Sequence, residues 1–197
     1  MLKPVQVVLR PSSEFVMHSV WKIIVFLGMV LPCSMYSQDT GWSSFSLGSP
    51  PLHLRLPGVP SALETQIQPS MLEVMRAYYA YEYEDSVNGI AVMLLQTTYA
   101  QHIHPDFTII SDQTIRDLTT RGALNIKYQT SSIETEGKKG FRQQGTLVFK
   151  GNTMDFTTNI VNEGANVWKI IILERTDDDN AKRITRTILD SITFKEN

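Results

Sequence analysis

Apolar and polar residues alternate most clearly at Leu52–Leu56, where every second residue is leucine. A period of two residues is typical of a half-buried strand, and Pro57 ends the pattern. A Ser- and Gly-rich segment, 39–48, precedes it, and two longer strand-like segments follow over 74–84 and 90–99. An Asn-Gly pair between these two segments tolerates the positive φ angles of a tight turn and therefore predicts a hairpin.

The middle of the chain predicts one helix and then a meander. Ser111 or Asp112 can cap a helix that runs to about Asn125, and a polar stretch follows over 129–140. Three further strands, separated by short turns with Asn and Gly, are expected over 141–150, 153–161 and 167–174. The last of them is apolar on both faces, which is typical of a central strand in a sheet that is covered on both sides.

A final helix is predicted after the acidic run at 177–179, because acidic side chains favour the positive end of the helix dipole. Its apolar stripe consists of Ala181, Ile184, Ile188, Leu189 and Ile192. The chain contains no long Gly/Ser linker and no repeat. The pattern therefore predicts a single α+β domain over 38–197, in which helices cover an antiparallel sheet.

The segment before this domain has the layout of a secretory signal peptide. Ile23–Leu31 forms an apolar stretch behind Lys22. It is too short to span a bilayer, which needs roughly 20 apolar residues, so we interpret residues 1–37 as a removable signal peptide with the residues upstream of it. Prolines and Glu14 near the beginning are unusual in a signal peptide, and we therefore expect translation to begin at Met17.

Two processing routes are open for this leader. Cleavage before Gln38 would release a domain without cysteine, whereas lipidation of Cys33 would anchor the product to a membrane. We favour the first route, because a lipoprotein signal usually has a small residue immediately before the cysteine and this chain has Pro32. The expected location is accordingly periplasmic or secreted, and a membrane-anchored lipoprotein is the alternative.

Charge and motif content argue against several classes of function. A net charge of -2 provides no broad basic field for nucleic acid. The sequence has no Gly-x-Ser-x-Gly elbow, no His-Glu-x-x-His motif and no phosphate-cradling Gly-rich loop. We therefore expect a protein that is not an enzyme and needs no cofactor.

A row of tyrosines is the first candidate binding surface. Tyr79, Tyr81 and Tyr83 alternate along one face of a predicted strand. If they are exposed, such a row can stack on a sugar or on a partner protein. More often an aromatic row packs in a core or against a neighbouring strand, and both interpretations are kept.

The second candidate is a metal site. His102, His104 and Asp106 lie at alternate positions of a loop, and two imidazoles with a carboxylate suit zinc. The simpler interpretation is a polar loop whose histidines are solvated.

Several landmarks together resemble the PsbP-like superfamily of photosystem II extrinsic subunits and exported bacterial proteins similar to DcrB. They are Trp42, the strand at Leu52–Pro57, the Tyr-rich hairpin, the mid-chain helix, the meander with Trp168 and the closing segment Ile188–Phe194. The resemblance implies an α/β/α sandwich and a binding or scaffolding role. Our leading hypothesis is a noncatalytic exported protein that binds a protein or an envelope component. The alternative is a small-ligand or metal-binding module, hydrolytic or not, around His102, His104 and Asp106.

Overall fold

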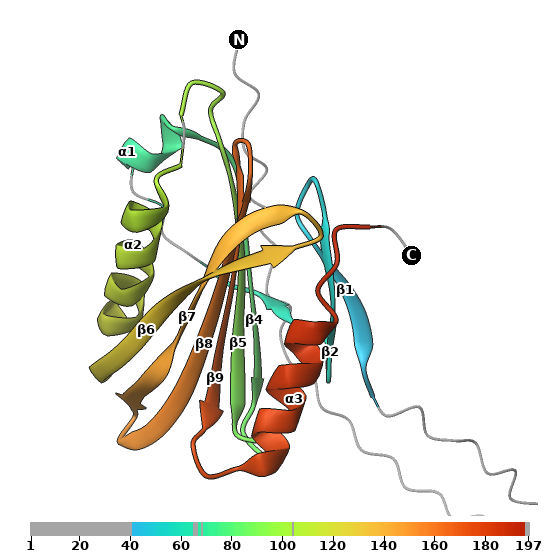
Figure 1. Cartoon of the computed structure of the whole chain (residues 1–197), viewed down its shortest axis with the longest axis vertical. Coiled ribbons are helices and arrows are strands. Elements are labelled where there is room, and N and C mark those ends of the chain that lie inside the picture. Colours follow the sequence, from blue (N-terminus) through green and yellow to red (C-terminus); the bar gives the residue numbers. More distant parts are fainter. Residues whose placement is uncertain (1–40, 65–66, 68, 104, 196–197) are drawn as a thin grey trace, which may run out of the picture. The chain divides into compact units, whose positions relative to one another are not determined.

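The computed structural model describes residues 41–195 apart from 65–66, 68 and 104 (Figure 1). Nine strands and three helices lie within these residues. The strands are β1 (Ser43–Leu47), β2 (Leu52–Leu56), β3 (Ser61–Ala62), β4 (Met75–Asp85), β5 (Ile90–Tyr99), β6 (Leu124–Thr135), β7 (Lys138–Phe149), β8 (Asn152–Glu163) and β9 (Asn166–Arg175). The helices are α1 (Pro69–Leu72), α2 (Phe107–Thr120) and α3 (Asp179–Asp190).

Seven strands form one sheet in the order β3-β4-β5-β9-β8-β7-β6, and β1 pairs with β2 in a separate hairpin. Every neighbouring pair in the large sheet is antiparallel. β9 lies at the centre of the sheet, as its apolar sequence on both faces predicts. The predicted fold class, an α+β domain built on an antiparallel sheet, is confirmed.

One face of the sheet, which we call the hairpin face, is covered by the β1–β2 hairpin and by α3 (Figure 1). Six buried side chains of β5 and β9 form its centre: Ile90, Val92, Leu94, Trp168, Ile170 and Ile172. The three leucines of β2 and the buried stripe of α3 pack onto them. The alternation of leucines in β2 therefore marks its buried side, as the sequence predicts.

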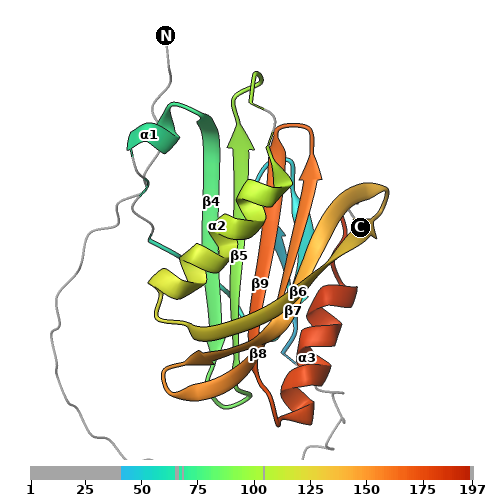
Figure 2. The same cartoon turned by 60° about the vertical axis from the view of Figure 1, so that its left-hand side comes forward.

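The opposite face, which we call the α2 face, carries the other side chains of the same strands and is crossed by α2 (Figure 2). Leu118 of α2 packs with Phe156 and Ile171 of the sheet, and Ile110 packs with Ile160. The sheet is thus covered on both faces. The resulting layers are α2, the sheet, and α3 together with the hairpin.

The beginning of α2 differs from the prediction. The helix begins at Phe107 and is capped by Asp106, whose carboxylate accepts the backbone N–H groups of Thr108 at 2.7 Å and Ile109 at 3.4 Å. The predicted cap at 111 or 112 was wrong, because the helix includes an additional first turn, 107–110, which Asp106 caps. Gly122, with φ 98°, ends the helix earlier than predicted, because glycine adopts this left-handed conformation without strain.

Three strands were not predicted, and one of them is the two-residue β3. β1 lies in the Ser- and Gly-rich segment, and β6 includes most of the polar stretch at 129–140. β6 is an edge strand that pairs only with β7 and is exposed along most of its length. It therefore has no buried side to produce an apolar alternation. The predicted meander of three strands is in fact one of four, β6 to β9.

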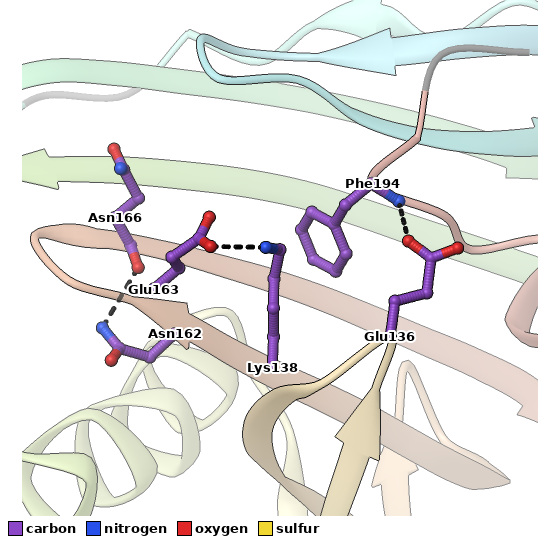
Figure 3. A network of polar contacts seen from close by, with 6 residues as sticks. All are labelled: Glu136, Lys138, Asn162, Glu163, Asn166 and Phe194. Carbon is purple, nitrogen blue, oxygen red and sulfur yellow. Dashed lines mark hydrogen bonds and ion pairs between the residues drawn. The ribbon is translucent and has the colours of Figure 1, made fainter.

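The C-terminal segment after α3 closes one edge of the hairpin face (Figure 3). The Glu136 carboxylate accepts the backbone N–H of Phe194 and the hydroxyl of Thr193, both at 2.8 Å. The Phe194 ring packs edge-on against Trp168, with ring centroids 4.8 Å apart. Lys138 lies over the same ring and pairs with Glu163 at 2.6 Å. The short turn between β6 and β7 thus holds Thr193 and Phe194 at the edge of the core.

Cys33, Met17 and the junction before Gln38 lie outside the described residues, so the predicted signal peptide, start and processing stay predictions. Among the residues that the structure describes, no helix is long and apolar enough to cross a membrane.

Candidate functional site

A cavity of about 650 Å³ lies between α2 and the half of the sheet formed by β4, β5 and β9. Its floor consists of alternate side chains on the α2 face of those strands, and α2 forms its roof. Residues in and beside α1 line its third side. The volume falls within the range of roughly 300–1,000 Å³ that small-molecule sites occupy.

The lining of the cavity is mainly apolar. Floor and side residues are chiefly aliphatic and aromatic: Ile67, Met71, Met75, Tyr78, Met93, Leu95, Tyr99, Val167 and Ile171. At the rim, Ile109 of α2 is 63% exposed and Met71 of α1 is 38% exposed. Large apolar side chains that stand in solvent beside an apolar cavity are typical of a ligand entrance.

Lys169 is the one charged side chain on the floor. It lies on the central strand β9, directly opposite Leu95 of β5 and Ile160 of β8. Its side chain is only 12% exposed. Burial lowers the pKa of Lys169, and the nearby carboxylate of Asp117 opposes that shift without cancelling it. An ammonium group is thus held at the bottom of an apolar cavity.

Asp117 of α2 is the ion-pair partner of Lys169, with 3.6 Å between Oδ2 and Nζ. This distance exceeds that of an ordinary hydrogen bond. The other carboxylate oxygen of Asp117 accepts a hydrogen bond from Gln113 at 2.7 Å, and the side chain is 40% exposed. Asp117 therefore lies at the rim, bound to its own helix, and contacts the ammonium group loosely.

Tyr99 adds a neutral polar group to the floor. Burial, together with the neighbouring Tyr78, raises the pKa of its phenol, which therefore stays protonated at neutral pH and can donate a hydrogen bond. The cavity thus combines a broad apolar lining with a few polar groups from three different elements.

A larger depression, of about 1190 Å³, lies where the β4–β5 turn, the β7–β8 turn and the beginning of α3 meet. Most of its charged side chains are exposed, and Arg175 already donates to the carbonyl oxygen of Ser86 at 2.7 Å. Exposed charges of this kind are largely satisfied by water. We therefore regard the cavity under α2 as the stronger candidate, although it is the smaller of the two.

The tyrosine row lies on the hairpin face. All three side chains are half-buried and pack against the core cluster of that face. The Tyr81 ring contacts Phe45 of β1 edge-on at 5.0 Å, and the Tyr83 hydroxyl donates to Asp85 at 3.2 Å. Tyr81 thus packs against the hairpin, and Tyr79 and Tyr83 join the core of the same face. Their use as a partner surface stays a prediction.

The predicted metal ligands are only partly described. His102 is exposed in the turn after β5, and Asp106 caps α2. His104 lies outside the described residues. No group of three metal-binding side chains gathers among the residues that are described. Because His104 is not among them, the proposed set stays a prediction.

Sequence analysis did not single out Lys169 or Asp117. A signal was nevertheless present, because Lys169 interrupts the apolar run 167–173 of a strand that was predicted to be central in the sheet. A lysine in such a position has to be paired, neutral or functional. Asp117 had no comparable signal, because it lies on a helix among other polar residues.

Element order and sheet topology together define a small α+β domain with an antiparallel sheet covered on both faces. Cyanobacterial PsbP (CyanoP) from Synechocystis sp. PCC 6803 is similar over 85% of this chain and 98% of its own, with a TM-score of 0.54 and 9% identity. This similarity confirms the expected PsbP-like fold, and at 9% identity it carries no residue's role over.

Two further solved structures show similarity. LpqN, described as involved in cell envelope biogenesis of Mycobacterium tuberculosis, covers 80% of this chain and 94% of its own, with 15% identity and a TM-score of 0.47. PA94, a protein of unknown function from Pseudomonas aeruginosa, covers 71% and 100%, with 7% identity and a TM-score of 0.44. No protein-family model and no curated protein matches the sequence.

Proposed function

We propose that this protein is a noncatalytic, envelope-associated binding protein that holds an amphipathic small molecule in the cavity under α2. The observation that carries the proposal is the cavity itself, which is apolar, about 650 Å³ in volume and bordered by exposed apolar side chains. An apolar molecule that enters it leaves water, and each buried CH₂ group contributes about 0.8 kcal/mol.

The sequence supports the location. A segment with the pattern of a secretory signal peptide precedes the domain, and export would place the protein among envelope lipids and other amphiphiles. Ligand binding is one of the two classes of function that the sequence leaves open. The proposed binding site is the cavity under α2 and not the loop at 102–106. An envelope component is also the kind of partner that the leading hypothesis names.

The test is binding of N-phenyl-1-naphthylamine, an uncharged dye that fluoresces in apolar surroundings, to the full chain after co-purified lipid has been removed. Wild-type protein is expected to bind the dye saturably. Leu95→Trp fills the floor of the cavity and is expected to weaken dye binding about tenfold or more. Overpacking can also destabilise by about 1–3 kcal/mol, so thermal unfolding is measured in parallel.

Val87→Trp is the matched control, because Val87 is 84% exposed in the β4–β5 turn and does not line the cavity. This variant introduces the same side chain and is expected to bind the dye as wild type does. Absence of saturable binding to the wild type contradicts the proposal. Equal binding by a folded Leu95→Trp variant contradicts it as well, because the dye would then bind elsewhere.

A further inference from the structure

The inference concerns the polar end of the ligand and rests on the proposed function. We infer that the cavity selects an amphiphile with one carboxylate head group, such as a fatty acid, and that Lys169 binds the head group. The apolar tail would then lie along Met93 and Leu95 of β5. Three observations lead to this class of ligand.

The first observation is the position of the ammonium group. Lys169 lies on the middle strand of the sheet, and its neighbours on the α2 face of β9 are Val167 and Ile171. Leu95, directly opposite on β5, is also apolar. A charged group in such surroundings is unfavourable unless an anion lies beside it. A ligand carboxylate that reaches the floor would therefore gain a charge-assisted hydrogen bond in a site from which water is largely excluded.

The second observation is that the present partner of Lys169 is weakly engaged. Asp117 lies 3.6 Å away, is 40% exposed and keeps a hydrogen bond to Gln113 on its own helix. An ammonium group has three N–H donors, and this contact occupies one of them at most. Asp117 can thus turn toward solvent without losing its bond to Gln113, and an entering carboxylate can take its place beside Lys169.

The third observation is the balance of charge in the lining. Lys169 and Arg121 are its cations and Asp117 is its anion. The lining therefore has one net positive charge, which a monoanionic carboxylate neutralises. A phosphate monoester carries close to two negative charges at neutral pH, which the single net positive charge of the lining does not balance. The site therefore favours a carboxylate over a phosphate.

The experiment measures displacement of N-phenyl-1-naphthylamine by three ligands with the same tail: laurate, dodecanol and dodecyl phosphate. Wild-type protein is expected to bind laurate about tenfold more tightly than dodecanol, because one charge-assisted hydrogen bond is added. Dodecyl phosphate is expected to bind more weakly than laurate. Equal or tighter binding of dodecyl phosphate would overturn the choice of a carboxylate.

Lys169→Met keeps a long apolar side chain and removes the charge. It is expected to bind dodecanol as wild type does and to lose the preference for laurate to within about twofold. Lys127→Met is the matched control, because it makes the same substitution at an exposed lysine of β6 that does not line the cavity. It should keep the preference. Asp117→Asn removes the competing carboxylate and should tighten laurate binding severalfold.

The possible failures are distinguishable. If the dye binds and both laurate and dodecanol displace it equally from wild type and from Lys169→Met, the head-group inference is wrong and the proposed function stands. If the wild type binds neither the dye nor any of the three ligands, the proposed function itself is wrong. Circular dichroism establishes that each variant is folded.

Discussion

The two faces of the sheet are covered in different ways, although the same strands supply both. On the hairpin face, Leu94 of β5 is completely buried beneath the hairpin and α3. Its neighbour Leu95 points to the α2 face, is only partly buried and lines the cavity. The side chain is leucine in both positions, so the difference lies in the elements that cover it.

Simple dimensions explain the difference. Seven strands about 4.8 Å apart make a sheet roughly 30 Å wide, whereas one helix is about 10 Å across. The hairpin face is covered by three elements, β1, β2 and α3, whereas the α2 face has a single long helix. α2 is held toward β7 by the bond from Gln143 to Ser111 at 2.8 Å and by the contact of Phe107 with Phe141. Space is therefore left over β4 and β5.

The largest expected effect comes from truncating the two adjacent leucines separately. Leu94→Ala removes a fully buried side chain and should lower the free energy of unfolding by about 3 kcal/mol. Leu95→Ala enlarges a cavity that already exists and should cost about 1 kcal/mol. Urea denaturation monitored by circular dichroism measures both. Equal losses would show that the two faces are packed equally well.

Removing the buried charge of the α2 face should have a smaller effect. Lys169→Met should raise the free energy of unfolding at pH 7 by about 1 kcal/mol, because a buried ammonium group is replaced by an apolar chain and Asp117 can be solvated. Burial lowers the pKa of Lys169, so the unfolded chain binds the proton more tightly than the folded one. Wild-type stability should therefore rise as pH increases from that lowered pKa toward the ordinary value of 10.5.

The advantage of Lys169→Met should consequently shrink over the same alkaline range. Stability of wild type and variant is measured at several pH values by urea denaturation. Lys127→Met, which replaces an exposed lysine on β6, serves as control and should show no such trend. A constant difference between Lys169→Met and wild type would mean that the ammonium group is not buried in solution.

The smallest expected effect concerns the edge of the hairpin face. Hydrogen bonds from Phe194 and Thr193 lower the pKa of Glu136. The stability that its carboxylate contributes is therefore present above the ordinary pKa of 4.5 and is lost as pH falls through the lowered pKa. Glu136→Gln should therefore raise hydrogen exchange at the C-terminal segment roughly two- to tenfold at neutral pH. Exchange mass spectrometry measures this rate.

Glu134→Gln is the control for this measurement, because Glu134 is exposed on β6, two residues before Glu136 in the following turn. It should leave exchange near Phe194 unchanged. If the two variants behave alike, the turn between β6 and β7 does not hold the C-terminal segment.

Elements with a periodic apolar pattern could be predicted from the sequence. The alternating leucines of β2, the two-sided apolar run of β9 and the stripe of α3 each report burial directly. β6 could not be predicted in the same way, because its partner β7 provides backbone hydrogen bonds while most of its side chains are exposed. The close pairing of β6 with β7 also depends on Gly145 of β7, because any side chain there would collide with the backbone of Lys127 on β6.

The candidate site was less accessible to sequence reasoning than the fold. Its apolar floor belongs to strands that were predicted, but the same residues would be expected in any core. What turns the floor into a cavity is the position of α2, which depends on contacts with β7 and β8 rather than on the helix's own sequence. The pair of Lys169 and Asp117 likewise depends on two elements that are distant along the chain.

The order of the strands also bears on how fast the chain can fold. β4 and β5 form a hairpin between neighbours in sequence, and β6 to β9 form a second local array. These halves are joined by the pairing of β5 with β9, which brings Ile90 beside Glu174. The entropy of closing that long loop is lost before any contact between the halves can compensate for it. Assembly of the central pair is therefore the slow event that topology imposes on this domain, whatever its final stability.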